Sequence, residues 1–237
     1  MLPAGPQVLS DLPLAIDPDE VLRFQGYKRG RDVPGADVRA LFDTALAEGR
    51  RLMAPRVVLR WAPVARMEAD ALEVDGQRLN IPRIGRLWGE LEHVAVALCT
   101  IGEALERRVA ELWDARELPL ASMLDSVGSG AVESLAEYVN DVLCQQGLPA
   151  LKVTNRISPG YADWDVAEQP RLFALCPGNP IGVVLNEACV MTPGKSISLL
   201  AGAGRVARVD HYFSQCARCW MRDCAYRRTP ARQTVRQ

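Results

Sequence analysis

The stretch DSVGSGAVESLAEYVNDVL, residues 125–143, lies within a segment that we predict to be one long helix, from about 119 to 146. Its run Gly-Ser-Gly at 128–130 is unusual inside a helix, because each glycine costs about 1 kcal/mol relative to alanine. Small side chains there would let another segment of backbone, or a ligand, come close to the helix. We therefore expect a close contact at this point of the chain.

The composition is that of an ordinary globular protein. The chain has 237 residues, of which 49% are hydrophobic and 24% are charged. This length suits one large domain or two small ones. With 28 basic and 29 acidic residues the formal net charge is −1, which gives no general reason to expect nucleic acid or an anionic membrane as a partner.

The sequence has no signals for a membrane or for export. No apolar run approaches the roughly 18 residues of a membrane span, and the first 20 residues lack the basic start and apolar core of a signal peptide. The seven cysteines are therefore expected to be thiols or metal ligands and not a disulfide framework. We expect the protein to reside in the cytoplasm.

Periodicity and turn signals give the order helices, strands, long helices, strands, which favours an α+β fold. Helices are expected over 19–27, 35–53, 86–115, 119–146 and 170–176. Strands are expected over 56–64, 151–157, 196–204 and 205–213, with a hairpin over 71–81 that turns at Asp75-Gly76. Residues 181–191 are expected to form one strand, or two with a kink between them.

We divide the chain into three parts. Residues 1–16 are Pro-rich and expected to be disordered or extended. Residues 17–212 form the α+β domain, within which 17–82 is a candidate N-terminal subdomain. Residues 213–237 form a Cys-rich tail.

Residues 156–164, RISPGYADW, form a predicted bend. Pro159 removes a backbone donor, and Gly160 allows backbone conformations that other residues rarely adopt. Arg156 precedes this bend and Tyr161 follows it. Taken alone, the bend would be interpreted as a structural turn that carries a surface cation.

Four segments in this order resemble the activation domain of cobalamin-dependent methionine synthase, and most of all its stand-alone bacterial form. They are TIGEALE (100–106), MLDSVGSGAVESLAEYV (123–139), RISPGYADWDVAEQPRLFAL (156–175) and NEACVMTPGKSIS (186–198). The resemblance covers roughly residues 15–228. It implies an α+β fold with a bent antiparallel sheet and long helices packed around it.

The resemblance also implies a binding site for S-adenosylmethionine. The Arg-x-x-x-Gly-Tyr motif of that family is matched by Arg156, Gly160 and Tyr161, and the ligand-facing glutamate by Glu133. The chemistry fits, because a guanidinium suits the carboxylate of this ligand and Glu133 suits its cationic end. In the family this domain docks on a cobalamin domain, where cob(II)alamin is reduced and methylated.

The chain departs from the family pattern at two places. Ala201 stands where a second tyrosine contacts the ligand, and Lys195 adds a cation that could meet a phosphate or a carboxylate. The chain also lacks the Asp-x-His-x-x-Gly motif that supplies the lower ligand of cobalamin. Any cobalamin is therefore expected to be carried by a partner, a corrinoid protein or cobalamin-binding methyltransferase.

The C-terminal tail carries Cys216, Cys219 and Cys224 in the pattern C-x2-C-x4-C. Three thiolates at this spacing can hold zinc or an iron–sulfur cluster, and Cys189, Cys176 or His211 could be the fourth ligand. We take Cys189 as the first choice for the fourth metal ligand. A group of reduced thiols that binds no metal is the alternative.

Three functions follow from these observations. The first is an accessory protein that binds S-adenosylmethionine and supports reductive methylation of a corrinoid on a partner methyltransferase. The second is a docking subunit of such an enzyme that binds no small ligand. The third is an iron–sulfur or zinc protein centred on the tail. The sequence does not decide whether the chain itself is an enzyme, and we assign no catalytic residue.

Overall fold

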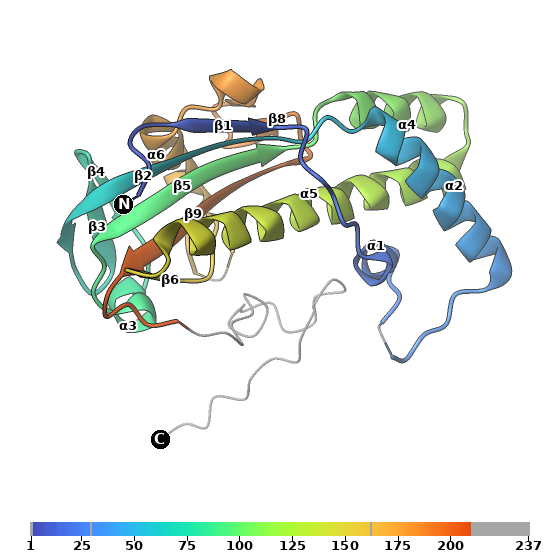
Figure 1. Cartoon of the computed structure of the whole chain (residues 1–237). Helices are drawn as coiled ribbons and strands as arrows, with labels where there is room; N and C mark the ends of the chain where they lie inside the picture. Colours follow the sequence, from blue (N-terminus) through green and yellow to red (C-terminus); the bar gives the residue numbers. More distant parts are fainter. Residues whose placement is uncertain (1, 29, 162, 210–237) are drawn as a thin grey trace.

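A seven-stranded antiparallel sheet forms the centre of the protein. The structure is a computed structural model, and it describes residues 2–28, 30–161 and 163–209. The strand order is β4-β3-β2-β5-β9-β6, and β1 also pairs with β2. The sheet is curled, and helices lie around it (Figure 1). The predicted α+β class with a bent antiparallel sheet is confirmed.

The longest strands make up the middle of the sheet. β5 (His93–Thr100) lies between β2 (Arg56–Met67) and β9 (Ser196–Gly204) and pairs with each of them over eight residues. β2 is long enough to pair with β1 (Gln7–Ser10) at its start and with β3 (Ala71–Val74) at its end. The predicted hairpin is formed by β3 and β4, and the remaining short strands are β4 (Gln77–Asn80), β6 (Lys152–Val153), β7 (Val184–Leu185) and β8 (Met191–Thr192).

The predicted helix over 86–115 is wrong in its central part. Residues 93–100 form β5, flanked by the short helix α3 (Ile84–Trp88) and by α4 (Ala104–Asp114). The strand HVAVALCT is buried at every position after His93, so both of its faces are apolar. A continuous apolar run of this length fits a buried strand or a buried helix equally well, and the helical spacing of Leu91, Val94 and Leu98 was a coincidence.

α5 (Leu118–Gly147) and α6 (Gln169–Leu175) lie on opposite faces of the sheet, whereas α1 (Pro18–Phe24), α2 (Ala36–Leu52) and α4 pack against α5. α5 is the predicted long helix, and it runs along one face of the sheet (Figure 1). The odd-numbered residues of β2 from Val57 to Trp61 point into the core beneath α5, whereas Val58 and Ala62 point to a second core on the other face. Two short 3-10 helices, η1 (Val166–Glu168) and η2 (Asn179–Ile181), flank α6 in the sequence.

The expected close contact at the Gly-Ser-Gly run of α5 is confirmed. A Cβ atom at Gly130 would lie 2.8 Å from Val21 Cγ2 of α1. A Cβ atom at Gly128 would lie 2.8 Å from Leu105 Cδ2 of α4 and 3.3 Å from Lys195 Cε. These two glycines therefore let two helices and a lysine side chain approach α5 more closely than any other residue would allow.

Three other segments can be compared with the sequence prediction. Residues 7–10 of the N-terminal segment form β1 and are thus extended, one of the two expected states. Residues 181–191 contain the two-residue strands β7 and β8 joined by a loop, which is the two-strand alternative, because Asn186 accepts hydrogen bonds from the backbone of 188 and 190 and closes a turn. Residues 205–209 are not a strand, and the rest of that predicted strand lies outside the described residues.

The boundary near residue 82 and the tail boundary at 213 stay predictions. The main sheet runs across the first of them, because β2 pairs with β5 over its length. In the described part of the chain, no helix is both long enough and apolar enough to span a membrane.

Candidate functional site

One face of α5 carries four polar residues at intervals of four. Asp125, Ser129, Glu133 and Glu137 lie above one another on this face, because residues four apart are neighbours on a helix. Two cationic side chains from other parts of the chain contact this face at different positions along the helix axis. Lys195 contacts the first two residues, and Arg156 contacts the last two.

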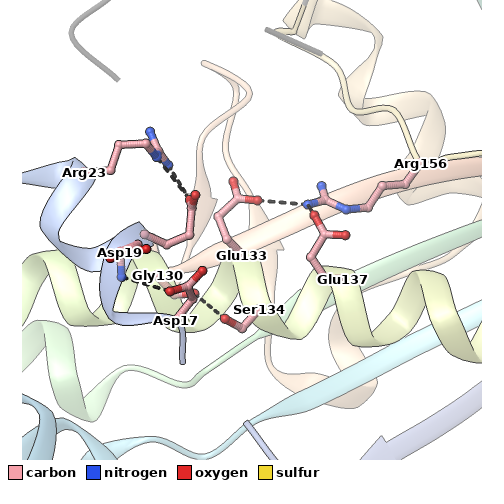
Figure 2. Close-up of polar contacts among 9 residues, drawn as sticks. Asp17, Asp19, Arg23, Gly130, Glu133, Ser134, Glu137 and Arg156 are labelled. Atoms are coloured by element: carbon pink, nitrogen blue, oxygen red, sulfur yellow. Dashed lines mark hydrogen bonds and ion pairs between the residues drawn. The ribbon is translucent and has the colours of Figure 1, made fainter. Parts of the chain in front are cut away.

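Arg156 is held between two carboxylates. Its Nη2 atom lies 2.9 Å from Glu133 Oε2 and 3.0 Å from Glu137 Oε1 (Figure 2). The side chain of Arg156 is 10% exposed and that of Glu133 is 17% exposed, whereas that of Glu137 is 61% exposed. The guanidinium is therefore mostly covered, with one carboxylate beneath it and one at the surface.

The backbone of Arg156 is attached to the same helix. Its amide donates to Oδ1 of Asn140, one turn beyond Glu137, over 3.1 Å. Burial opposes the charge of the guanidinium, but the negative charges of Glu133 and Glu137 and their hydrogen bonds outweigh this effect and raise the pKa of Arg156. The arginine is therefore cationic under all ordinary conditions.

Lys195 lies over the first part of the same helix face. Its Nζ atom is 2.8 Å from Asp125 Oδ1 and 2.8 Å from Ser129 Oγ, and its side chain is 17% exposed. The backbone amides of Gly194 and Lys195 both donate to the carboxylate of Glu106 on α4. Since α5 rises 1.5 Å per residue, the two cation positions lie about 12 Å apart along the helix.

The bend after Arg156 is closed by its own backbone. The amide of Gly160 donates to the carbonyl of Trp164 over 2.8 Å, and the amide of Trp164 donates to the carbonyl of Tyr161 over 3.1 Å. Gly160 has a φ of +85°, which favours glycine there. Trp164 is buried in the core, while the side chain of Tyr161 is half exposed. The bend thus presents a phenol ring at the surface.

Ala201, which the resemblance set against a second ligand-binding tyrosine, belongs to the core. It lies in β9 opposite Ala95 of β5 and is completely buried in the core beneath α5. The structure therefore brings Glu133, Arg156 and Lys195 to one helix face, with Gly160 and Tyr161 on the bend that starts at Arg156.

The sequence analysis missed three acidic contributions to this region. Glu137 lies one turn from Glu133, a spacing that would have indicated it. Asp19 and Glu20 of α1 come from a segment 110 residues earlier. The contact between Val21 and Gly130 brings α1, with Asp19, to α5 (Figure 2). Glu20 pairs with Arg23 at 2.9 Å.

A cavity of about 550 Å³ lies at the other end of the bend. The turn between β2 and β3 contributes Glu68 and Asp70 to its lining, β4 contributes Arg78, and the chain at the end of the bend contributes Asp163 and Asp165. None of the five predicted ligand residues lines this cavity. Its carboxylates are engaged within the protein, for example Glu68 with Arg78 at 2.7 Å. The bend therefore separates this cavity from the face of α5.

The predicted metal ligands are only partly described. Cys189 is half-buried in the loop before β8, and burial raises the pKa of Cys176 to about 11. Among residues 2–209 apart from 29 and 162, no group of three or more His, Cys, Asp or Glu side chains could hold a metal ion. Cys216, Cys219, Cys224 and His211 lie outside the described residues, so the predicted site in the tail stays a prediction.

Comparisons with known proteins support the fold. No protein-family model matches the chain, and no curated protein matches it in sequence. Among solved structures, a crystal structure of the MetH reactivation domain bound to AdoHcy is similar to this chain. The match covers 90% of this chain and 81% of that one, with a TM-score of 0.65 and 16% sequence identity. At this identity the similarity shows a common fold.

Proposed function

We propose that this protein binds S-adenosylmethionine and supports the reductive methylation of a corrinoid cofactor that a partner methyltransferase carries. The observation that carries the proposal is the Glu133–Arg156 pair on the face of α5, in a fold similar to that of a reactivation domain which binds AdoHcy. The pair presents both charges that an amino-acid ligand needs.

The residues of the site suit the parts of this ligand. Arg156 would hold the carboxylate, because a guanidinium offers several donors in one plane. Glu133 would hold the positive ammonium or sulfonium group, and the exposed ring of Tyr161 would lie against the adenine. Gly160 would let the ligand approach the backbone of the bend. Lys195, about 12 Å away along α5, would line the far end of the site.

The protein's part in the reaction is binding and positioning. The methyl donor, a reductant and the partner's cobalt would supply the chemistry, whereas this chain holds the donor and docks on the partner. We therefore assign no general acid, base or nucleophile. In this proposal the protein works in the cytoplasm, where its cysteine thiols stay reduced.

The Cys-rich tail has a proposed role of its own. Cys216, Cys219 and Cys224, with Cys189 as a fourth ligand, would hold zinc or an iron–sulfur cluster. A cluster would suit a protein that helps to deliver an electron to cob(II)alamin. Metal analysis of the purified protein, together with an absorbance spectrum before and after dithionite, distinguishes the two metals.

Titration calorimetry with S-adenosylmethionine tests the proposal. We expect the wild-type protein to bind and an Arg156→Gln variant to bind at least tenfold more weakly, because a hydrogen bond to a charged group contributes about 1.5–3 kcal/mol. Arg107→Gln is the matched control, since Arg107 is an exposed arginine of α4. Equal affinity of the Arg156→Gln variant and the wild type would contradict the assigned site.

A ligand-free docking subunit is the second candidate function. One observation favours it, namely that Arg156 already has two carboxylate partners. The expected replacement of the second tyrosine by Ala201 agrees with this candidate. Calorimetry that detects no binding of S-adenosylmethionine, while a cobalamin-binding methyltransferase is still recovered by affinity purification from the native cell, would select this function.

A further inference from the structure

Arg56, the first residue of β2, differs from the other half-buried cations of the protein. In residues 2–28, 30–161 and 163–209, every other half-buried lysine or arginine pairs with a carboxylate; these residues are Arg23, Arg60, Arg108, Arg156, Arg171 and Lys195. Within the same ranges Arg56 has no carboxylate partner, and its buried Nε atom has no hydrogen-bond acceptor. A partly covered positive charge without a counter-charge is unfavourable. An anion from outside the chain would therefore improve the environment of Arg56.

The guanidinium of Arg56 lies beside Gly182, the residue that follows η2. A Cβ atom at Gly182 would lie 3.8 Å from Nη2 and 4.0 Å from Nη1 of Arg56. Gly182 is exposed and has a φ of +74°, which favours glycine. Because this residue has no side chain, it does not cover the terminal nitrogens of the guanidinium. Their planar pair of donors matches the two oxygens of a carboxylate.

Two exposed valines lie near this guanidinium. Val8 of β1 is two residues from Ser10, the residue opposite Arg56, and residues two apart on a strand share one face. Val184 of β7 follows Gly182 by two residues. The two valines are 52% and 56% exposed. An open cation with apolar neighbours suits a carboxylate that carries an apolar group, because such a ligand can form an ion pair and bury apolar surface together.

We propose that Arg56 is the centre of a binding site for an organic carboxylate with a short apolar chain. The carboxylate would reach the terminal nitrogens of Arg56 past Gly182, and the apolar chain would lie against Val8 and Val184. This site is separate from the face of α5, because Arg56 shares its face of β2 with Val58, which belongs to the core on the opposite side of the sheet. The inference therefore does not depend on the proposed function.

NMR titration of the full chain with three anions at equal ionic strength tests the proposal. The probes are isovalerate, acetate and inorganic phosphate, and the readout is the backbone amide resonance of Val184. We expect a saturable shift with isovalerate, at an affinity at least threefold higher than that of acetate. Burial of one methylene group alone corresponds to about a fourfold gain. Phosphate, which has no apolar part, should bind more weakly than isovalerate.

Two variants and a control assign the response to Arg56. Arg56→Gln should weaken isovalerate binding at least tenfold. Gly182→Asn keeps the arginine, and asparagine tolerates a positive φ, but its side chain would cover the guanidinium and should also weaken binding. Arg107→Gln, at an exposed position of α4, should leave the affinity unchanged. Circular dichroism and thermal unfolding check that each variant is folded.

Several outcomes would overturn the proposal. They are the absence of a saturable shift with isovalerate, an affinity for isovalerate no higher than that for acetate, and tighter binding of phosphate than of isovalerate. An unchanged affinity of folded Arg56→Gln or folded Gly182→Asn would also exclude the assigned site. Calorimetry with S-adenosylmethionine tests the proposed function without Arg56, so the two proposals can fail separately.

Discussion

The energetic coupling between Arg156 and its two glutamates can be measured by double-mutant cycles. The perturbations are Arg156→Leu, Glu133→Gln and Glu137→Gln, singly and in the two pairs with Arg156. Breaking a fully buried ion pair costs about 3–5 kcal/mol, whereas an exposed pair contributes about 0.2–1 kcal/mol. The pair with Glu133, 10% and 17% exposed, lies between these limits, and we expect a coupling of about 1–2 kcal/mol.

The pair with Glu137 should behave as a surface pair. Glu137 is 61% exposed, so its coupling to Arg156 should be at most about 1 kcal/mol. Urea unfolding followed by circular dichroism gives the free energy of unfolding of each variant. A coupling to Glu137 as large as that to Glu133 would refute the reasoning, because exposure would then not decide how strongly each glutamate couples to Arg156.

Three further results are expected. Gly130→Ala should lower the free energy of unfolding by about 1–2 kcal/mol in urea titrations, since the new Cβ at 2.8 Å from Val21 Cγ2 outweighs the gain in helix propensity. Lys195→Met should cost at most about 1 kcal/mol in the same assay, because its partner carboxylate is half exposed and stays hydrated. Hydrogen bonds from the Arg205 guanidinium lower the pKa of Glu92 from 4.5 to about 2. This pair therefore stabilises the fold above about pH 4.5, the stabilisation is lost as the pH falls towards 2, and NMR titration of an Arg205→Gln variant should show the pKa of Glu92 rising towards 4.5.

The fold was predictable where local signals are unambiguous. The β3–β4 hairpin follows from the turn-forming pair Asp75-Gly76. The long helix α5 follows from the length of its helical sequence pattern. β5 was not predictable, because a strand that is buried on both faces has no alternation to distinguish it from a helix. Its environment depends on β2 and β9, which lie far from it in the sequence.

The site was predictable only in part. Resemblance pointed to Glu133 and Arg156, and the structure places them in contact at 2.9 Å, while their part in binding a ligand stays a prediction. The spacing along α5 indicates that Glu137 lies near Glu133, but its contact with Arg156 depends on which rotamer the arginine adopts over α5, and no local pattern fixes that. The close approach of α1 to α5 depends on Gly130. The sequence indicated a close contact at this glycine, but it did not indicate that Val21 of α1 makes the contact.

The most direct test of the account is a crystal structure of the protein soaked or grown with S-adenosylmethionine. We predict that the ligand lies against the face of α5, with its carboxylate on Arg156 and its positive charge near Glu133. A ligand bound instead in the cavity beside Asp163 and Asp165, without contact to Arg156, would contradict the account.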